Sequence, residues 1–363
     1  MKMKYRIQIV GVVVVAALFE CAMAQQVVCW GDNSYNQCAV PANIGLVTAV
    51  AAGAYHTTAL RSDGKVRAWG VNSDGACDVP ADLRDVVQIS AANSNSAAVR
   101  SDGTVVVWGS NDAGQCSVPI GLNDVVEIRV GGLGHMLARR SSGSLVAWGR
   151  NNYGQCDVPT LPAPAAAIAA RGEGHCLAAL SSGQLVAWGW NLYGQTSVPE
   201  QARGAVAVAA GNWHSVVLRA GGGVVCWGAN GSGQCDVPPA ATAGVVSIAA
   251  GVANTLALRS DGMLLAWGFN SYGNSTIPAN ASGVTSFDGG HCHSAISKTA
   301  AAACLGDIYV DHRIDGGDLG VLLANWGPVS SSVASRACDI DGNGDVNGAD
   351  LGNLLSNWGP CSN

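Results

Sequence analysis

The sequence predicts an all-β, seven-bladed propeller, closed by its own N-terminal strand and followed by a small α-helical domain of paired calcium loops. A Trp-Gly pair recurs at intervals of 39 or 40 residues and begins at Trp30, Trp69, Trp108, Trp148, Trp188, Trp227 and Trp267. The chain is also poor in charge and rich in turns, with 12% charged residues and 48 glycines in 363. A period of about 40 residues with Trp, Gly and alternating apolar residues is typical of propeller blades, which cannot bury their faces alone.

Residues 1–24 are predicted to be a secretory signal peptide. Lys2, Lys4 and Arg6 precede an apolar run, and Ala22-Met23-Ala24 forms a small-x-small cleavage site. The apolar run is shorter than the roughly 18 residues that a membrane anchor needs, and no later segment has that character. We therefore expect a secreted or extracellular protein of bacterial type without a membrane span. A lipid anchor on Cys21, at the cell surface, is the alternative.

Four strands are predicted in each repeat. In the first complete repeat, Val47–Gly53 alternates small and apolar residues and fits an inner strand, followed by His56–Arg61 and Lys65–Trp69. A Ser-Asp-Gly turn joins the last two strands. We also expect a short outer strand that ends at Val79-Pro80, because proline is tolerated at a strand end or an edge.

The predicted propeller spans residues 25–297, and its last repeat is incomplete. That repeat stops at Ser297, before its own Trp-Gly strand, whereas the chain opens with the missing piece, Val27–Gly31. We expect this N-terminal strand to complete the last blade, which removes open sheet edges that would favour aggregation.

One repeat position carries histidine in five repeats, namely His56, His135, His175, His214 and His293, with Ser96 and Asn254 in the other two. Equivalent positions lie around the ring and do not converge on one point, so we interpret them as hydrogen-bonding residues between strand and loop rather than as metal ligands.

A second position carries cysteine five times, Cys38, Cys77, Cys116, Cys156 and Cys235, replaced by Thr196 and Ser275. These replacements indicate a half-buried packing site, and a bridge across blades would need Cα atoms within about 7 Å. We expect most of these cysteines to be free thiols. Cys29 and Cys292, both in the closing blade, are the best candidates for a disulfide.

Aromatic side chains interrupt the repeat in the loops. The Gly-x-x-His turns and the loops after Trp-Gly must share one face, with the Ser-Asp-Gly turns on the opposite face. Large aromatics at exposed loop tips are typical binding anchors. The predicted ligand-binding face contains Tyr35, Tyr55, Tyr153, Trp190, Tyr193, Trp213, Phe269 and Tyr272.

Composition and motifs argue against several functions. A formal net charge of −6 gives no basic surface for nucleic acid or anionic lipid. The sequence has no G-x-S-x-G, H-E-x-x-H or phosphate-loop motif, and the mature chain holds only Glu127, Glu173 and Glu200 as glutamates. We expect no enzyme. The alternative is a carbohydrate-active hydrolase with a pair of aspartates.

The repeat resembles the regulator-of-chromosome-condensation family of seven-bladed propellers. The resemblance covers residues 25–297 and is carried by Trp-Gly-x-Asn-x-x-Gly-Gln, Ala-Ala-Gly-x-x-His and Ser-Asp-Gly-x-Val-x-Ala-Trp-Gly. The Gly-Gln-x-x-Val-Pro version is similar to bacterial secreted members, including the propeller-type β-lactamase inhibitory protein. These motifs imply the fold and not a function. The signal peptide and the acidic balance argue against the nucleotide-exchange role of eukaryotic members.

A linker at 298–303 precedes a second, shorter duplication, in which Ile314–Pro328 matches Val346–Pro360. Oxygen ligands at loop positions 1, 3, 5 and 12, with Gly at position 6, are those of a calcium loop. The predicted calcium ligands are Asp339, Asp341, Asn343, Asp345 through its carbonyl, and Asp350. A helix that carries leucines on one side is expected to begin near Asp350.

The first copy of the loop is weaker. It keeps Asp307, Asp311 and Asp318, but Tyr309 fills position 3 and His312 replaces the glycine. Because a domain of this size buries little core, we expect calcium and a disulfide to stabilise it. Cys304 and Cys361 flank the module and are the candidate pair, with Cys338 as the alternative partner.

The paired loops at 304–361 resemble a dockerin module, and this resemblance implies a calcium cofactor and a cohesin-like protein partner. The sequence thus predicts a secreted, non-catalytic propeller that binds an unidentified protein or glycan and is anchored through the calcium-dependent module. Polysaccharide breakdown by a carbohydrate-active enzyme and inhibition of a secreted enzyme are the alternative functions.

Overall fold

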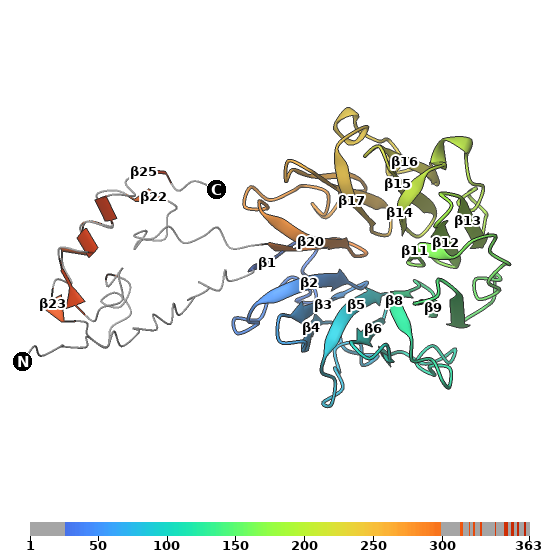
Figure 1. Cartoon of the computed structure of the whole chain (residues 1–363), viewed down its shortest axis with the longest axis horizontal. Helices are drawn as coiled ribbons and strands as arrows, with labels where there is room; N and C mark the ends of the chain where they lie inside the picture. The colour runs from blue at the N-terminus through green and yellow to red at the C-terminus, as the bar shows by residue number, and fades with distance from the viewer. Residues whose placement is uncertain are drawn as a thin grey trace, which may run out of the picture.

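The computed structural model describes residues 26–298 and, beyond them, residues 313–314, 319, 322–323, 327–328, 338, 345–347, 350–351, 354–355 and 359–360. Residues 26–298 contain seven three-stranded antiparallel sheets, arranged around an axis with one strand of each near the centre (Figure 1). The predicted all-β, propeller-like fold is therefore confirmed.

The strands follow one another in chain order within sheets 1 to 6. Sheet 1 contains β2 (Val47–Ala52), β3 (His56–Arg61) and β4 (Val66–Gly70); sheet 2 contains β5 (Val86–Ala92), β6 (Asn95–Arg100) and β7 (Val105–Gly109); sheet 3 contains β8 (Val125–Val130), β9 (His135–Arg140) and β10 (Leu145–Gly149). Sheet 4 contains β11 (Ala165–Ala169), β12 (His175–Leu180) and β13 (Leu185–Gly189); sheet 5 contains β14 (Ala205–Ala210), β15 (His214–Arg219) and β16 (Val224–Gly228). Sheet 6 contains β17 (Val245–Ala250), β18 (Asn254–Arg259) and β19 (Leu264–Gly268); sheet 7 contains β20 (Val284–Gly289), β21 (His293–Lys298) and β1 (Gln26–Gly31). Two short 3-10 turns, Glu200–Ala202 and Pro239–Ala241, precede sheets 5 and 6.

Sheet 7 joins strands from distant parts of the chain. β1 pairs antiparallel with β21, in a register that runs from Gln26 opposite Lys298 to Gly31 opposite His293. β21 also pairs with β20 on its other side, so it is the central strand of the sheet.

The core lies between neighbouring sheets. Trp148 of sheet 3, only 8% exposed, packs in one cluster with Val99 of sheet 2 and with Ile128 and Met136 of its own sheet. Trp30, Trp69, Trp108, Trp188 and Trp267 are buried in the corresponding clusters. Burial of one such apolar side chain contributes about 1.5–3 kcal/mol, so the repeated tryptophan is a main source of adhesion between sheets.

Every innermost strand carries a β-bulge at its second residue. In β2 the pairing shifts between Val47 and Ala49, and the same shift occurs in the other six sheets. A bulge leaves one residue unpaired and increases the local twist. The exposed bulge residues are Thr48, Val87, Val126, Ala166, Val206, Val246 and Thr285.

The predicted outer strand is wrong. Within residues 26–298 each sheet has three strands, and the segment that leads to Val79-Pro80 forms turns. Its backbone groups bond locally: the amide of Asp78 donates to the carbonyl of Gly75 at 3.0 Å, and the amide of Val79 donates to that of Cys77 at 2.9 Å. Because these amides already donate within turns, they cannot pair a fourth strand with the sheet.

The described pieces beyond residue 298 pair as a pseudo-symmetric duplicate. β22 (Arg313–Ile314) pairs with β25 (Gly359–Pro360), and β24 (Asp345–Val346) pairs with β23 (Gly327–Pro328). Leu322, Cys338, Val346 and Leu354 are buried together. Most of the predicted helical domain, 304–361, lies outside the described residues. Among the described residues, no helix is both long enough and apolar enough to cross a bilayer.

Candidate ligand-binding face and axial funnel

The loop after each Trp-Gly pair is held by its own side chains. In sheet 3 the carboxamide oxygen of Asn151 accepts the amide of Cys156 at 2.8 Å, and that of Gln155 accepts the amide of Tyr153 at 2.8 Å. The asparagine contact recurs in all seven loops. The repeated phrase therefore encodes a loop of fixed shape.

The glutamine position also connects neighbouring sheets through its carbonyl. The indole Nε1 of Trp188 donates to the carbonyl of Gln155 at 3.0 Å, and the hydroxyl of Ser215 donates to that of Gln195 at 2.7 Å. Each loop is thus bonded to the sheet that follows it, and loop and sheet position one another.

The histidines act between sheets. The Nε2 atom of His56 lies 2.9 Å from the hydroxyl of Ser96, and that of His175 lies 3.1 Å from the hydroxyl of Ser215. His214 with Thr255, His293 with Thr57, and His135 with the thiol of Cys176 make the same contact. Because Ser96 and Ser215 donate to carbonyls, Nε2–H is the donor to each of these hydroxyls.

The predicted histidine register is wrong in sheet 2. Asn95, and not Ser96, occupies the histidine position, where it begins β6 opposite Gly109. Ser96 is the following residue and accepts the histidine of the preceding sheet. The bond therefore runs from sheet to sheet and not from strand to loop.

The burial of these histidines determines their protonation state, and the close packing of their rings requires glycine at the preceding turn position. Burial lowers the pKa of His135 and His214 to about 4 and that of His175 to about 3. A Cβ on Gly211 would lie 2.0 Å from the ring of His214. The Gly-x-x-His pattern is therefore a packing requirement, and the rings are neutral at pH 7.

The predicted Cys29–Cys292 disulfide is wrong. Cys29 pairs with Cys38, and Cys226 pairs with Cys235, each with 5.0 Å between Cα atoms. Cys292 is a free thiol 2.9 Å from Nδ1 of His291. Both bridges join the third strand of a repeat to its own loop, nine residues later, and so lie within a repeat rather than across blades.

The other loop cysteines agree with the expectation of free thiols. Cys77, Cys116 and Cys156 are unbridged and half-buried, and burial raises the pKa of Cys77 and Cys156 to about 11. In these repeats the strand position holds Ala68, Val107 or Ala147 in place of a cysteine.

The eight predicted face aromatics form four contact pairs. Tyr153 and Trp190 stack with ring centroids 4.6 Å apart and an interplanar angle of 9°. The other pairs are Tyr35 with Tyr55, Tyr193 with Trp213, and Phe269 with Tyr272, with centroids 5.1, 5.4 and 5.9 Å apart. One tyrosine of each pair, namely Tyr35, Tyr153, Tyr193 and Tyr272, is 44–54% exposed.

A funnel of about 220 Å³ opens at the axis where the Gly-x-x-His turns of the sheets meet. Its lining includes one turn residue from each sheet: Ala54, Asn93, Leu133, Glu173, Asn212, Val252 and His291. Tyr55 and Arg171 also line it, so the funnel adjoins the Tyr35–Tyr55 pair.

None of these turn residues was predicted from the sequence to be functional. A signal for them does exist in the sequence. The segments on either side repeat from sheet to sheet, whereas the residues at this position differ in charge and size.

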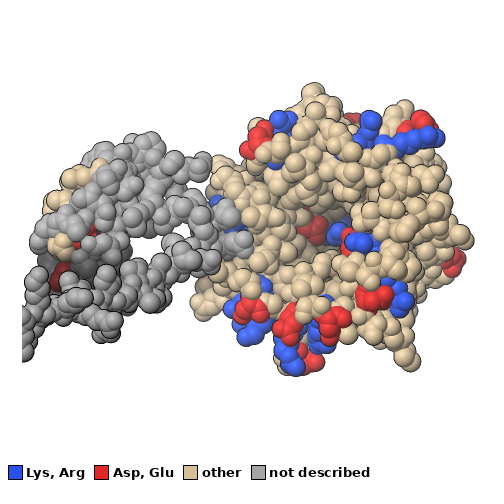
Figure 2. All heavy atoms as spheres, in the orientation of Figure 1, with Lys and Arg blue, Asp and Glu red and all other residues tan. Residues whose placement is uncertain are grey.

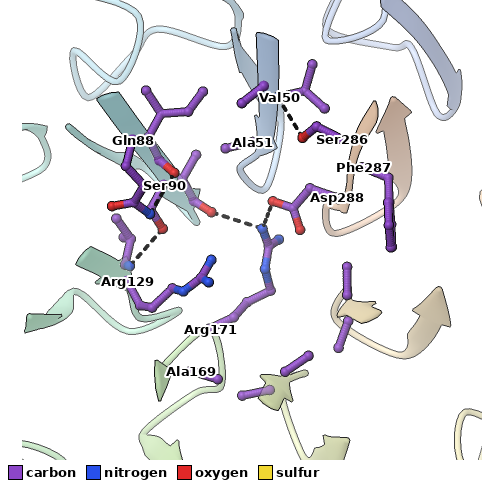
Figure 3. A pocket seen from close by; sticks show the side chains of 18 of the residues that line it. Val50, Ala51, Gln88, Ser90, Arg129, Ala169, Arg171, Ser286, Phe287 and Asp288 are labelled. Carbon is purple, nitrogen blue, oxygen red and sulfur yellow. Dashed lines mark hydrogen bonds and ion pairs between the residues drawn. The ribbon is translucent and has the colours of Figure 1, made fainter. Parts of the chain in front are cut away.

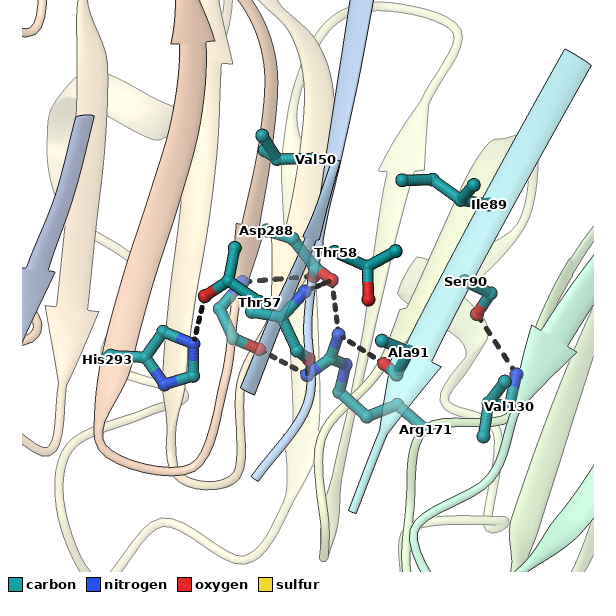
Figure 4. A network of polar contacts seen from close by, with 12 residues as sticks. Val50, Thr57, Thr58, Ile89, Ser90, Ala91, Val130, Arg171, Asp288 and His293 are labelled. Atoms are coloured by element: carbon teal, nitrogen blue, oxygen red, sulfur yellow. Dashed lines mark hydrogen bonds and ion pairs between the residues drawn. The ribbon is translucent and has the colours of Figure 1, made fainter. Parts of the chain in front are cut away.

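Beyond the funnel, a channel of about 310 Å³ runs between the innermost strands. Arg171 and Asp288 point toward one another across it (Figure 3). Arg171 also donates to the carbonyls of Ala52, Ala91 and Gly289, and Asp288 accepts the amide of Ala52 at 3.0 Å (Figure 4). Acidic and basic side chains accordingly meet in the central hollow of Figure 2.

The predicted calcium ligands are described only in part. Asp350 is buried, and its carboxylate accepts the amide of Asn347 at 2.8 Å, whereas Asp345 is exposed. Outside the described residues lie the predicted ligands Asp307, Asp311, Asp318, Asp339, Asp341 and Asn343, the candidate disulfide of Cys304 and Cys361, and the predicted signal peptide. Among the described residues, no group of three His, Cys, Asp or Glu side chains is placed to hold a metal ion.

Comparison with known proteins gives one family and one fold. The model of the regulator of chromosome condensation (RCC1) repeat matches residues 47–76, 86–115, 125–155, 165–195, 205–234 and 245–274, half of the chain. Human WBSCR16 is 18% identical over 76% of this chain and 99% of its own, with a TM-score of 0.61. Prp20p from Saccharomyces cerevisiae is 21% identical over 76% of this chain and 92% of its own, with a TM-score of 0.60. The ectodomain of the receptor kinase CR4 from Physcomitrella patens is 22% identical over 67% of this chain and 68% of its own, with a TM-score of 0.55. At these identities the likeness shows the fold alone.

No curated protein matches the chain in sequence.

Proposed function

Because the chain belongs to the family built from regulator of chromosome condensation (RCC1) repeats, we propose that it is a non-catalytic binding protein. In this proposal a seven-bladed propeller, closed by β1, takes a protein or glycan ligand on its aromatic face. The observation that carries the proposal is the grouping of eight loop aromatics into four contact pairs, two of which reach the axial funnel through Tyr55 and Trp213. Half-exposed, mutually supported Tyr and Trp rings give large contact area at a small loss of conformational entropy on binding.

Export is part of the proposal. The Cys29–Cys38 and Cys226–Cys235 bridges support it, because disulfides persist in oxidising compartments and are rare in the cytosol. The signal-like residues 1–24 agree with it.

The C-terminal duplicate is proposed to be a calcium-dependent anchor for a cohesin-like partner. Its support is the equivalent pairing of β22 with β25 and of β24 with β23, together with the shared buried cluster. Asp345 and Asp350 fit the ion as oxygen donors, and Asp339, Asp341 and Asn343 would complete the set. Bound calcium would offset the repulsion between these carboxylates and stabilise the loop.

Capture of partners from the culture medium of the source organism tests the binding function. The full chain carrying Trp190→Ala with Tyr193→Ala should retain at least tenfold less partner than the unchanged chain. Val206→Ala with Val246→Ala, at exposed bulge positions, is the matched control and should retain the unchanged amount. Equal capture by both double variants, at equal thermal stability, would remove the aromatic face as the binding surface.

A further inference from the structure

We infer that the axial funnel receives a single neutral sugar ring of a glycan. The inference rests on the proposed binding function and gives the ligand at the axis a chemical class. Seven equivalent turns contribute seven positions to the lining, and their side chains are apolar, amide, acidic or imidazole. Packing between sheets accounts for the repeated residues but requires no such variety in the turns.

The polar part of the lining is already held in place. Glu173 accepts the carboxamide of Asn212 at 2.9 Å and the indole N–H of Trp213 at 3.0 Å. Within residues 26–298, the carboxamide of Asn93 and the Nε2 atom of His291 form no hydrogen bond with another side chain or backbone group. The funnel therefore presents a fixed carboxylate together with amide and imidazole groups that a ligand can engage.

Charge excludes an anionic ligand. The nitrogens of Arg171 that face the axis donate to three carbonyls and to Asp288. Burial lowers the pKa of His291, so its ring is neutral at pH 7. An anion would thus meet the Glu173 carboxylate without a free cation in the described lining.

Charge also disfavours a cationic ligand. Both oxygens of Glu173 already accept a hydrogen bond, from Asn212 and Trp213, so the carboxylate is partly satisfied before a ligand binds. A ligand whose hydroxyls both donate and accept matches the carboxylate, amide and imidazole groups.

Size and shape point to one ring. The volume of about 220 Å³ is below the range of about 300–1,000 Å³ that is typical of pockets for drug-sized molecules. The rings of Tyr55 and His291, with centroids 5.5 Å apart, give the rim flat faces, and Leu133 and Val252 supply apolar contacts. A pyranose ring has an apolar face to set against such groups and hydroxyls at its edge.

The test uses the full chain on an array of neutral, acidic and amino-sugar glycans, followed by calorimetry with the oligosaccharide that binds. A neutral glycan should bind. Asn93→Gly should weaken it about tenfold, which equals about 1.4 kcal/mol. Glycine is chosen because Asn93 has a φ of 46°, which glycine adopts without strain. Leu133→Trp, which fills the funnel, should abolish binding, whereas Asn123→Gly at an exposed site outside the funnel should change nothing.

Three results would overturn the inference. One is a lack of binding to every neutral glycan. Another is binding restricted to amino sugars and lost in Glu173→Gln, which would assign a cationic ligand. The third is sugar binding that survives Leu133→Trp. Each is separate from the proposed function, because capture of a protein partner that depends on Trp190 and Tyr193 would still support a binding face without a sugar at the axis.

Discussion

Arg171 and Asp288 form an ion pair across the central channel although they come from sheets 4 and 7, 117 residues apart. Arg171 follows β11 and bonds at the same time to carbonyls of sheets 1, 2 and 7. One side chain therefore connects four sheets at the axis, where the innermost strands otherwise offer mainly small and apolar residues.

Arg171→Met should destabilise the protein by about 3 kcal/mol, because a largely buried carboxylate then loses its partner. Replacing both members, Arg171→Met with Asp288→Leu, should recover part of that loss. Denaturant unfolding measures both. The control is Arg203→Met, whose partner Glu200 is 72% exposed and whose loss should cost less than about 1 kcal/mol. An Arg171 variant as stable as the control would contradict a role for the pair in joining the sheets.

Acid should destabilise the protein between pH 6.5 and about pH 4. Burial lowers the pKa of His56, His135 and His214 from 6.5 to about 4 and that of His175 and His293 to about 3. The unfolded chain therefore binds more protons in this window. The stabilisation is complete above pH 6.5 and is lost as the pH falls toward the folded pKa. At pH 5 each histidine should cost roughly 2 kcal/mol.

His214→Asn should flatten this pH profile, because Asn95 and Asn254 show that the position accepts an amide. Melting temperatures from pH 7.5 to pH 5 give the slope for both chains. The same slope in the variant and the unchanged chain would show that His214 does not contribute to the acid sensitivity.

Ala147→Cys should form a third disulfide, with Cys156. The position matches Cys29 and Cys226, each of which pairs with a cysteine nine residues later. Loop closure should add roughly 2 kcal/mol of stability. Mass spectrometry and thiol labelling would detect the loss of the Cys156 thiol. Ala187→Cys is the matched control, because its loop partner is Thr196 and an additional free thiol should result. A labelled Cys156 thiol in the first variant would contradict the equivalence of the repeats.

Calcium should bind the full chain at one site. Asp339→Ala should abolish binding because it removes the first ligand of the second loop. Asp307→Ala, in the loop where Tyr309 and His312 break the pattern, should leave it intact. Calorimetry of the full chain counts the ions. Two ions of equal affinity would show that the first loop also binds, and no ion would remove the calcium-dependent anchor.

The fold was predictable because its contacts repeat. Each tryptophan packs against the preceding sheet and each loop asparagine bonds its own loop, so a single period in the sequence reports the same contact many times. The shared location of the turns and loops that carry the aromatic residues was predictable for a related reason, since the direction of each hairpin determines the face on which its turns lie. The role of these residues in ligand binding stays a prediction.

Contacts that occur once or twice were not predictable from the period. The Arg171–Asp288 pair depends on the positions of sheets 4 and 7 around the axis of the propeller-like fold. No local sequence pattern encodes these positions. The two disulfides did have a signal, because only the repeats of Cys29 and Cys226 carry cysteine at both the strand and the loop position. The predicted outer strand failed because proline is as compatible with a turn as with an edge strand, and the amides of this segment bond within turns.

The pairing of β1 with β21 has a consequence for biosynthesis. β1 leaves the ribosome before any other strand of the ring, yet its partner is made only after every other sheet. Throughout translation β1 lacks its hydrogen-bonding strand partner, and sheet 7 cannot form until Lys298 has been added. Premature termination anywhere upstream leaves an incomplete ring with exposed edges, so a quality-control protease would distinguish truncated chains from finished ones.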